Sequence, residues 1–326
     1  MTIKKQGKPS VTCIVIGLNE ENNLRQSLCS VMNSLKENEH VEVIYVDSGS
    51  TDNSVAIATS IDNVNVVHLD VSQPSAAKGR NCGLELASGE FIQFLDGDSV
   101  LDPQWLTLAM AFLREHQDYA CVFGGLIEEN TQHNIYTRLC AIDWHITPGD
   151  YRLCGGNALW RKSDLDSVHG FDTAMQVGEE PDLCYRIRQQ NRKIRCLDIP
   201  MAKHDLEMHS FRDYWARGIN NGVAYAAVGM RYRYMPEKLW LREMLRNFVE
   251  PVVWLMVLFV GLMFFSVAVA VTLLLALVLL RAIMIAVSSR NKTLSILQGV
   301  AYGLHLQLIR IPVVIGQLKY LFMMRG

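Results

Sequence analysis

Short apolar runs alternate with segments of helical periodicity in the first third of the chain. The runs at 11–18, 41–46, 64–69 and 91–95 have the length of buried strands. Between the first two runs, apolar residues from Leu24 to Leu35 recur at helical spacing, and we expect another helix at about 76–87. Strands that alternate with helices predict an α/β fold, with a mostly parallel sheet and helices flanking it.

Further elements are expected beyond this half of the sheet. Asp102 and Pro103 provide an N-cap and a first-turn proline, so we expect a helix to begin there. Residues 157–160 have the pattern of a strand, and residues 178–183 open a helix with acidic residues in its first turn.

From Val249 to Val287 the chain is almost wholly apolar, broken mainly by Glu250 and Arg281. A single helix of this length would measure roughly 58 Å, about twice the ~30 Å hydrocarbon core of a bilayer. Two short spans joined as a hairpin therefore fit better than one helix. Basic residues stand on both sides, among them Arg246 before the hairpin and Arg290 and Lys292 after it. By the positive-inside rule, both flanks are expected in the cytoplasm.

These patterns predict two parts, a cytosolic domain at 1–235 and a membrane region at 236–326 of a multi-pass protein in the cytoplasmic (inner) membrane. A third apolar segment, Leu294 to Phe322, carries His305, Gln307 and Gln317. It either spans the membrane, re-enters it, or lies in the interface as an amphipathic helix.

Composition narrows the classes of protein further. The chain of 326 residues has a net charge of −2 and dispersed basic residues, which gives no basis for nucleic-acid binding. Its eight cysteines are scattered without any Cys-x-x-Cys spacing, so neither a zinc site nor a disulfide framework is expected.

Polar side chains follow three of the predicted strands. Asn19 and Glu20 follow the first strand, Asp47 follows the second, and Asp96 and Asp98 follow the strand at 91–95. Ligands of such sheets bind at the carboxyl ends of the strands. Taken alone, the Asp-Gly-Asp pair is either a polar turn after a buried strand or a Mg²⁺-type cation site that is shared with the phosphates of a nucleotide. Mg²⁺ uses few carboxylates and completes its shell with ligand oxygens and water.

Several motifs in the same order over roughly residues 10–225 resemble the family 2 glycosyltransferases, enzymes of the GT-A fold that use nucleotide sugars. The opening strand with Asn19 and Glu20, the Asp47-Ser48-Gly49-Ser50 segment, Lys78-Gly79-Arg80-Asn81, Asp96-Gly97-Asp98 and Gly178-Glu179-Glu180 carry the resemblance. The Gln-x-x-Arg-Trp motif of processive members is absent from the sequence, which favours transfer of one sugar.

The resemblance implies a role for each matching residue of the donor site. Asn19, Glu20 and Asp47 would bind the nucleoside, with Asp47 on the base, and Lys78 and Arg80 would bind the diphosphate. Asp98 would ligate Mg²⁺ or Mn²⁺, while Asp96 would contact the sugar or ribose and the surroundings of the metal. His204 would lie near the metal or the diphosphate.

The base that deprotonates the acceptor hydroxyl would be an acid of the Gly-Glu-Glu segment. Glu180 aligns with the family's catalytic aspartate and is the favoured candidate, while Glu179 and Asp182 remain open.

The implied activity is inverting transfer of a sugar from a nucleotide-sugar donor to a lipid-linked saccharide in cell-surface polysaccharide synthesis. The partners implied by this activity are other proteins of a polysaccharide assembly system. One alternative is a polyprenyl-phosphate glycosyltransferase, whose phosphate acceptor has less need of a base. Another is a non-catalytic, membrane-anchored binder of nucleotide sugars. A nucleotidyltransferase would need a glycine-rich phosphate loop near the first strand, where the sequence has none.

Overall fold

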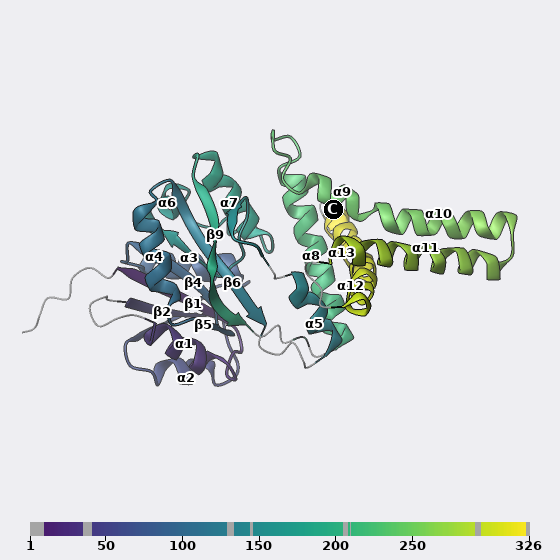
Figure 1. Ribbon diagram of the computed structural model, residues 1–326. Coiled ribbons are helices and arrows are strands. Elements are labelled where there is room, and N and C mark those ends of the chain that lie inside the picture. Colours follow the sequence, from purple (N-terminus) through teal and green to yellow (C-terminus); the bar gives the residue numbers. More distant parts are fainter. Residues whose placement is uncertain are drawn as a thin grey trace, which may run out of the picture. The chain divides into compact units, whose positions relative to one another are not determined.

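The computed structural model describes residues 10–34, 41–128, 134–143, 146–204, 208, 210–290 and 295–323. It divides into two compact units, Met1–Asn130 with Ile146–Leu206, and Thr131–His145 with Glu207–Gly326. The first unit contains the sheet and the second is helical (Figure 1). Lys292 and Leu294, used above to delimit the membrane segments, lie outside the described residues, and the domain boundary near residue 235 stays a prediction.

The first unit is a mixed sheet flanked by helices, which confirms the predicted fold class (Figure 1). The strand order is β3-β2-β1-β4-β8-β6-β9-β5, and β7 pairs with β9. The strands are β1 (Val11–Gly17), β2 (Val41–Asp47), β3 (Val64–His68), β4 (Phe91–Asp96), β5 (Ser99–Leu101), β6 (Tyr119–Glu128), β7 (Gly149–Tyr151), β8 (Ala158–Arg161) and β9 (Lys193–His204). The helices are α1 (Leu24–Met32), α2 (Ser54–Thr59), α3 (Ala76–Leu86), α4 (Trp105–Glu115), α6 (Lys162–Ser167) and α7 (Glu179–Gln189).

The four strands predicted in the first third of the chain pair in parallel, with β1 between β2 and β4. Their registers place Gly17 beside Asp47 and Ile16 beside Asp96, so these strands end at one level. Because the carboxyl ends of parallel strands share one edge, the polar residues that follow them are collected there. Beyond β4 the sheet changes to antiparallel pairing with β8.

The helix predicted to begin at Asp102 and Pro103 begins later, at Trp105. Asp102 still acts at this end, because its Oδ1 accepts a hydrogen bond from the Gln104 backbone N–H at 2.9 Å. The aspartate therefore forms a local turn before the helix rather than its N-cap.

A buried polar pair ties α4 to the strand that carries the site. Gln93, on β4, and Trp105, on α4, are both fully buried. The Trp105 indole N–H donates to Gln93 Oε1 at 2.7 Å, and the Gln93 amide donates to the Phe94 carbonyl at 2.7 Å. Each polar group removed from water thus has a partner, which a buried amide requires if it is not to destabilise the fold.

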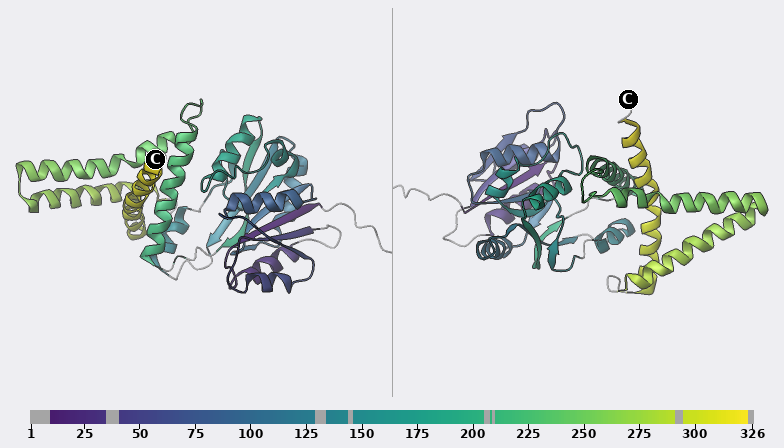
Figure 2. Two further views of the ribbon diagram at one scale, coloured as in Figure 1. Left: turned by 180° about the vertical axis from the view of Figure 1, so that it is seen from behind. Right: turned by 90° about the horizontal axis from the view of Figure 1, so that it is seen from above.

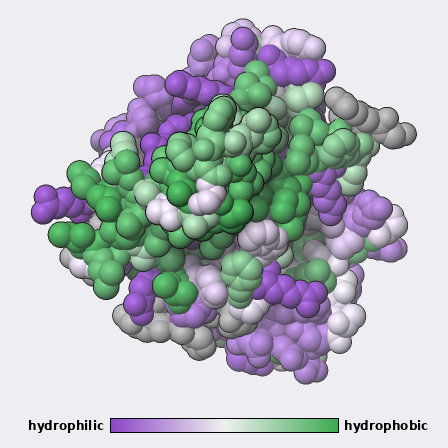
Figure 3. Space-filling model, turned by 90° about the vertical axis from the view of Figure 1, so that its right-hand side faces the viewer, coloured by the Kyte–Doolittle hydropathy of each residue, from purple (hydrophilic) through white to green (hydrophobic). Residues whose placement is uncertain are grey.

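The second unit contains helices only: α5 (Ile135–Asp143), α8 (Phe211–Arg231), α9 (Leu241–Asn247), α10 (Val249–Phe264), α11 (Val267–Ser288), α12 (Ile296–Leu308) and α13 (Arg310–Met323). Figures 1 and 2 show α10 and α11 as an antiparallel hairpin, as the apolar pattern predicts. Large side chains such as Leu255, Phe259, Phe264 and Leu275 are more than 60% exposed on it. They contribute to a broad apolar surface (Figure 3).

Three helical stretches in the described residues are long and apolar enough to cross a membrane: Leu241–Phe264, Val267–Ser288 and Ile296–Met323. The third is the segment that the sequence left open, and its polar residues turn inward. Gln317 is fully buried, accepts from the Asn247 amide at 2.7 Å and donates to the Met244 carbonyl at 2.9 Å. These bonds satisfy an amide that would be costly to expose to lipid.

The Gln93–Trp105 pair generates a prediction about stability. Gln93→Leu keeps the side-chain volume but leaves the buried Trp105 N–H without an acceptor, so we expect a loss of about 1–3 kcal/mol. Thermal unfolding of the detergent-solubilised chain, followed by intrinsic fluorescence, measures it. The control Gln104→Leu changes the exposed residue directly before α4 and should leave the melting temperature nearly unchanged. Equal melting temperatures for both variants would contradict this role of the pair.

Candidate active site

The Asp96-Gly97-Asp98 segment joins the end of β4 to β5. Asn157, which precedes β8, is buried and holds this segment from the neighbouring strand. Its Oδ1 accepts from the Asp96 backbone N–H at 2.8 Å, and its amide donates to the Ser99 hydroxyl at 3.1 Å. The Gly97 backbone N–H donates to the Ile16 carbonyl at 2.9 Å. The two carboxylates are therefore carried on a backbone that is fixed on both sides.

Arg80, on α3, is the buried centre of the site. Its side chain is 3% exposed, and Nη2 lies 3.1 Å from Asp96 Oδ1. Nη1 lies 2.9 Å from Glu179 Oε1 and 3.6 Å from Glu180 Oε1. One guanidinium thus joins the end of β4 to the start of α7. Such a fork suits several carboxylates at once, because its N–H groups point in fixed directions within one plane.

Two further residues complete the surroundings of this guanidinium. The Arg80 carbon Cζ lies 5.4 Å from the centre of the Phe171 ring, within range of a cation–π interaction. A Cβ atom at Gly156 would lie 2.1 Å from Arg80 Nη2 and 3.3 Å from Glu180 Oε1. Only glycine leaves room for the buried cation at position 156.

The three acidic residues of the first turn of α7 have different environments. Asp182 is fully buried, and its Oδ2 accepts from Arg186 Nε at 2.7 Å. Glu179 is also buried and is paired with Arg80 at 2.9 Å. The side chain of Glu180 is 27% exposed, against 7% for Glu179 and 0% for Asp182. Of the three, Glu180 is the acid that a molecule from solution can best reach.

Burial raises the pKa of Glu180 to about 7. Arg80 opposes this rise, and the nearby charges of Glu179 and Asp96 add to it. For Arg80 itself burial lowers the pKa, but the charges of Asp96, Glu180 and Glu179 outweigh burial, so its pKa is raised. A permanent cation therefore lies beside a carboxyl that exchanges its proton near neutral pH.

Asp98 and His204 form a second polar pair at this edge. Asp98 Oδ2 lies 3.3 Å from His204 Nε2, and the Ser99 hydroxyl donates to Asp98 Oδ1 at 3.2 Å. The described residues contain no cluster of three or more His, Cys, Asp or Glu side chains arranged to hold a metal. A carboxylate and an imidazole nonetheless fit an ion that takes most of its ligands from phosphates and water. These two side chains suit such a shared site and not a closed protein cage.

Of the residues predicted to bind the nucleoside, Asn19 and Glu20 lie in the loop after β1, which hydrogen-bonds to the segment that follows β2. Asn19 Oδ1 accepts from the Thr51 backbone N–H, and the Glu20 N–H donates to the Ser54 hydroxyl, both at 2.8 Å. Asp47 is buried, and its Oδ2 accepts from the backbone N–H groups of Gly49 and Ser50 at 3.0 Å. Through these two bonds Asp47 fixes the conformation of the loop after β2. Asn19 lies exposed in the loop after β1.

Lys78 lies on the first turn of α3, two residues before Arg80. Its ammonium group donates to the Gln73 carbonyl at 2.6 Å on the exposed side of the helix. The two basic residues of this helix thus occupy different environments, one buried among carboxylates and one open to solvent.

The structure brings together Arg80, Asp96, Glu179 and Glu180, which the sequence could only place on separate segments. Asp182 does not belong to this group, because its carboxylate pairs with Arg186 instead. Sequence reasoning missed Gly156, Asn157 and Phe171, although the pair Gly155-Gly156 directly before a strand is a signal for close backbone approach.

The family model for glycosyl transferase family 2 matches residues 12–164. The minor teichoic acid biosynthesis protein GgaA of Bacillus subtilis is 38% identical over 186 residues, which cover 50% of this chain and 39% of GgaA. The chain spans less than half the length of the curated relatives that it matches first.

Two solved structures show the same fold at low sequence identity. The mannosyltransferase PcManGT from Pyrobaculum calidifontis, in complex with GDP-Man and Mn²⁺, is 19% identical with a TM-score of 0.65, covering 96% of this chain and 88% of PcManGT. Staphylococcus aureus TarS in complex with UDP is 19% identical with a TM-score of 0.51, covering 69% of this chain and 72% of that structure.

Loss of the Arg80 cation should be costly, because it leaves Glu179 and Asp96 without their partner. We expect Arg80→Met to destabilise the chain by about 3–5 kcal/mol, as is typical when one member of a buried ion pair is removed. Thermal unfolding measures this, with Lys78→Met as the control on the same helix. A melting temperature for Arg80→Met as high as that of Lys78→Met would show that the guanidinium does not hold the site together.

Proposed function

We propose that this chain, which matches the model of glycosyl transferase family 2 over residues 12–164 and shares the fold of PcManGT, transfers a sugar with inversion from a nucleotide-sugar donor to a lipid-linked saccharide. The observation that carries this proposal is the cluster at the carboxyl edge of the sheet. A candidate cation pair, Asp98 and His204, and an accessible acid, Glu180, belong to one edge that also holds Arg80 and Asp96.

The donor is proposed to lie along this edge. Asn19, Glu20 and Asp47 would bind the nucleoside, Lys78 would bind the diphosphate, and Asp96 would bind the ribose or sugar. Complexes of TarS with UDP and of PcManGT with GDP-Man and Mn²⁺ support a nucleotide sugar as the class of donor. Asp98 and His204 would hold Mg²⁺ or Mn²⁺, which supplies positive charge for the departing diphosphate.

Arg80 is proposed to act in two ways. Its charge adds to the positive potential that the diphosphate meets, as the motif suggests. Its contacts with Asp96, Glu179 and Glu180 orient the acids on both sides of the reacting centre. Because the Arg80 side chain is only 3% exposed, we expect its orientation of the acids to contribute more to the reaction than its charge on the diphosphate.

Glu180 is proposed as the general base. Its carboxylate takes the proton of the acceptor hydroxyl while the hydroxyl oxygen bonds to the anomeric carbon of the donor. The bond from that carbon to the diphosphate oxygen breaks at the same time, and the electron pair leaves with the nucleoside diphosphate. Attack from the opposite face inverts the configuration. A pKa near 7 suits this step, because the group is a sufficient base and about half of it is ionised at pH 7.

Membrane association supports a lipid-linked acceptor. Three helical stretches long and apolar enough to cross a membrane would keep the enzyme near an acceptor whose carrier lies in the same bilayer. We propose a multi-pass protein of the cytoplasmic membrane with its catalytic domain in the cytoplasm. The naming of GgaA as a teichoic acid biosynthesis protein supports a place in cell-surface polysaccharide synthesis.

A panel of nucleotide sugars, assayed with the detergent-solubilised chain for release of nucleoside diphosphate, tests the activity. We expect release with at least one donor in the presence of Mn²⁺ or Mg²⁺ and its loss with EDTA. Asp98→Asn should lower the rate at least about a hundredfold, because the metal neutralises the leaving group. The control Asp118→Asn alters an exposed surface pair with Lys193. Donor binding without any turnover would instead indicate a non-catalytic binder.

Replacement of the base tests the acceptor chemistry. Glu180→Gln should lower kcat by about 10²–10⁴-fold, because the amide cannot take the hydroxyl proton. For the unmodified chain, kcat/KM should rise about tenfold per pH unit below pH 7 and level off above it, as the raised pKa of Glu180 requires.

The exposed Glu115→Gln serves as the matched control for this substitution. Near-full activity of Glu180→Gln would overturn the hydroxyl mechanism and support transfer to a phosphate acceptor, which needs no base.

A further inference from the structure

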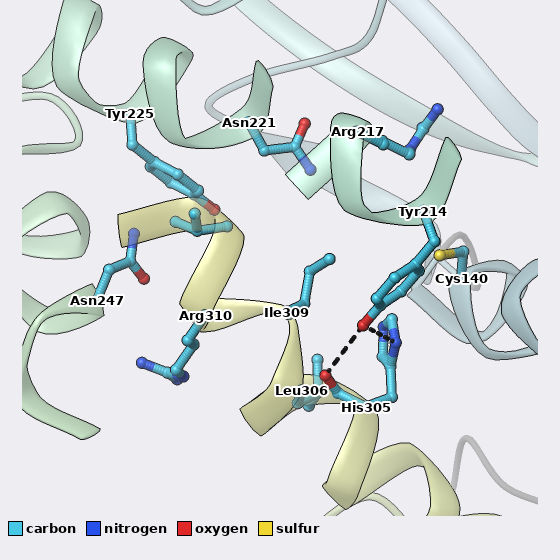
Figure 4. Close-up of a pocket in the computed structure, with 11 residues that line it drawn as sticks. Cys140, Tyr214, Arg217, Asn221, Tyr225, Asn247, His305, Leu306, Ile309 and Arg310 are labelled. Carbon is cyan, nitrogen blue, oxygen red and sulfur yellow. Dashed lines mark hydrogen bonds between the residues drawn. The ribbon is translucent and has the colours of Figure 1, made fainter. Parts of the chain in front are cut away.

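The helical unit contains a partly open cavity that the proposed sugar transfer does not use. It has a volume of about 320 Å³ and is lined by residues of α5, α8, α9, α12 and α13 (Figure 4). Figure 4 shows the Tyr214 hydroxyl at one end, beside His305, and Tyr225 and Asn247 toward the other. The Tyr214 oxygen lies 3.0 Å from His305 Nδ1, so this end is built from a buried hydrogen-bonded pair.

The lining is rich in hydrogen-bond donors and cations. Its polar members include two guanidinium groups, two amides and two phenols, from Arg217, Arg310, Asn221, Asn247, Tyr214 and Tyr225. None of the described residues that line the cavity is a carboxylate. Such a lining selects an anion, and arginine forks match the oxygens of phosphate in particular. Leu306, Ile309 and Val313 give the same cavity an apolar wall.

The charges around the cavity do not cancel. Glu250 is buried, and its two carboxylate oxygens are shared by Arg281 at 3.1 Å and Arg310 at 2.8 Å. One negative charge therefore faces two positive ones. Arg217 is exposed on α8 and forms no ion pair with any residue that the structure describes. Net positive charge is thus available at the cavity.

These charges lie at one depth along the hairpin, on the side of the bilayer away from its turn. Glu250 stands 14 residues before the end of α10 at Phe264, and Arg281 stands 14 residues after the start of α11 at Val267. At 1.5 Å per residue both lie roughly 21 Å from the turn of the hairpin, toward one side of a ~30 Å hydrocarbon core. Arg310 contacts Glu250 and also lines the cavity, so the cavity adjoins this level.

We propose that this cavity binds the phosphate or diphosphate group of a lipid, with Arg217 and Arg310 on the anion and the apolar wall beside the first carbons of the lipid chain. This inference rests on the proposed function, since a lipid-linked acceptor is the molecule that would bring such a group to the chain. It assigns recognition of the carrier to the helical unit and recognition of the donor to the sheet.

Direct binding to the full detergent-solubilised chain tests the site. The probes are farnesyl diphosphate, inorganic diphosphate and farnesol, measured by microscale thermophoresis. We expect farnesyl diphosphate to bind more tightly than both others, because only it has the anion and the apolar chain together. Arg217→Gln should weaken that binding at least about tenfold, as for the loss of one charged hydrogen bond. Arg212→Gln, an exposed arginine of the same helix outside the cavity, should bind as the unmodified chain does.

Equal binding by Arg217→Gln and the unmodified chain would overturn the site. If inorganic diphosphate binds as tightly as farnesyl diphosphate, the proposal that the ligand is a lipid is overturned. The cavity would then be a site for a soluble anion. Donor turnover by the same preparation separates this inference from the proposed function. Turnover of a nucleotide sugar without Arg217-dependent binding would overturn only the cavity proposal. Arg217-dependent binding without turnover of any nucleotide sugar would overturn only the transferase proposal.

Discussion

The site depends on one buried cation. Arg80 joins the end of β4 to the first turn of α7, through Asp96 on one side and Glu179 and Glu180 on the other. The fold accommodates it with a ring, Phe171, and with a glycine, Gly156, where any side chain would collide with the guanidinium. A charge with so little exposure is tolerated only because its partners are charged, and they in turn depend on it.

The same network divides the acids of α7 among different tasks. Arg186 holds Asp182 and Arg80 holds Glu179, so both carboxylates are committed to ion pairs inside the protein. Glu180 lies at the longer distance of 3.6 Å from Arg80, and burial is the main cause of its raised pKa. The three acids on this helical turn thus differ in what they can do because their partners and their exposure differ.

In the helical unit, polar side chains are buried among apolar helices and need partners there. Gln317 satisfies its amide on α9, and Glu250 is covered by two arginines. Polar residues in apolar segments are expensive and commonly mark a function. Here Gln317 links α13 to α9 by hydrogen bonds. Other polar residues, among them Arg310, line the cavity.

The α/β class, the parallel strands, the apolar hairpin and the polar residues at the strand ends could all be predicted from the amino-acid sequence. This was possible because hydrophobic periodicity and turn chemistry are local properties of the chain. The predicted start of α4 was wrong by two to three residues, since Asp102 caps a turn before the helix.

Which charges meet in the site depends on how the helices and strands pack together. Arg80 and Glu179 are 99 residues apart along the chain, and no periodicity relates them. The sequence could name Arg80 as a cation near a diphosphate, but its burial among carboxylates arises from the packing of α3 and α7 against the sheet. The difference between Glu180 and its neighbours has the same origin, because the pKa of a carboxyl is set by burial and by charges that folding brings close.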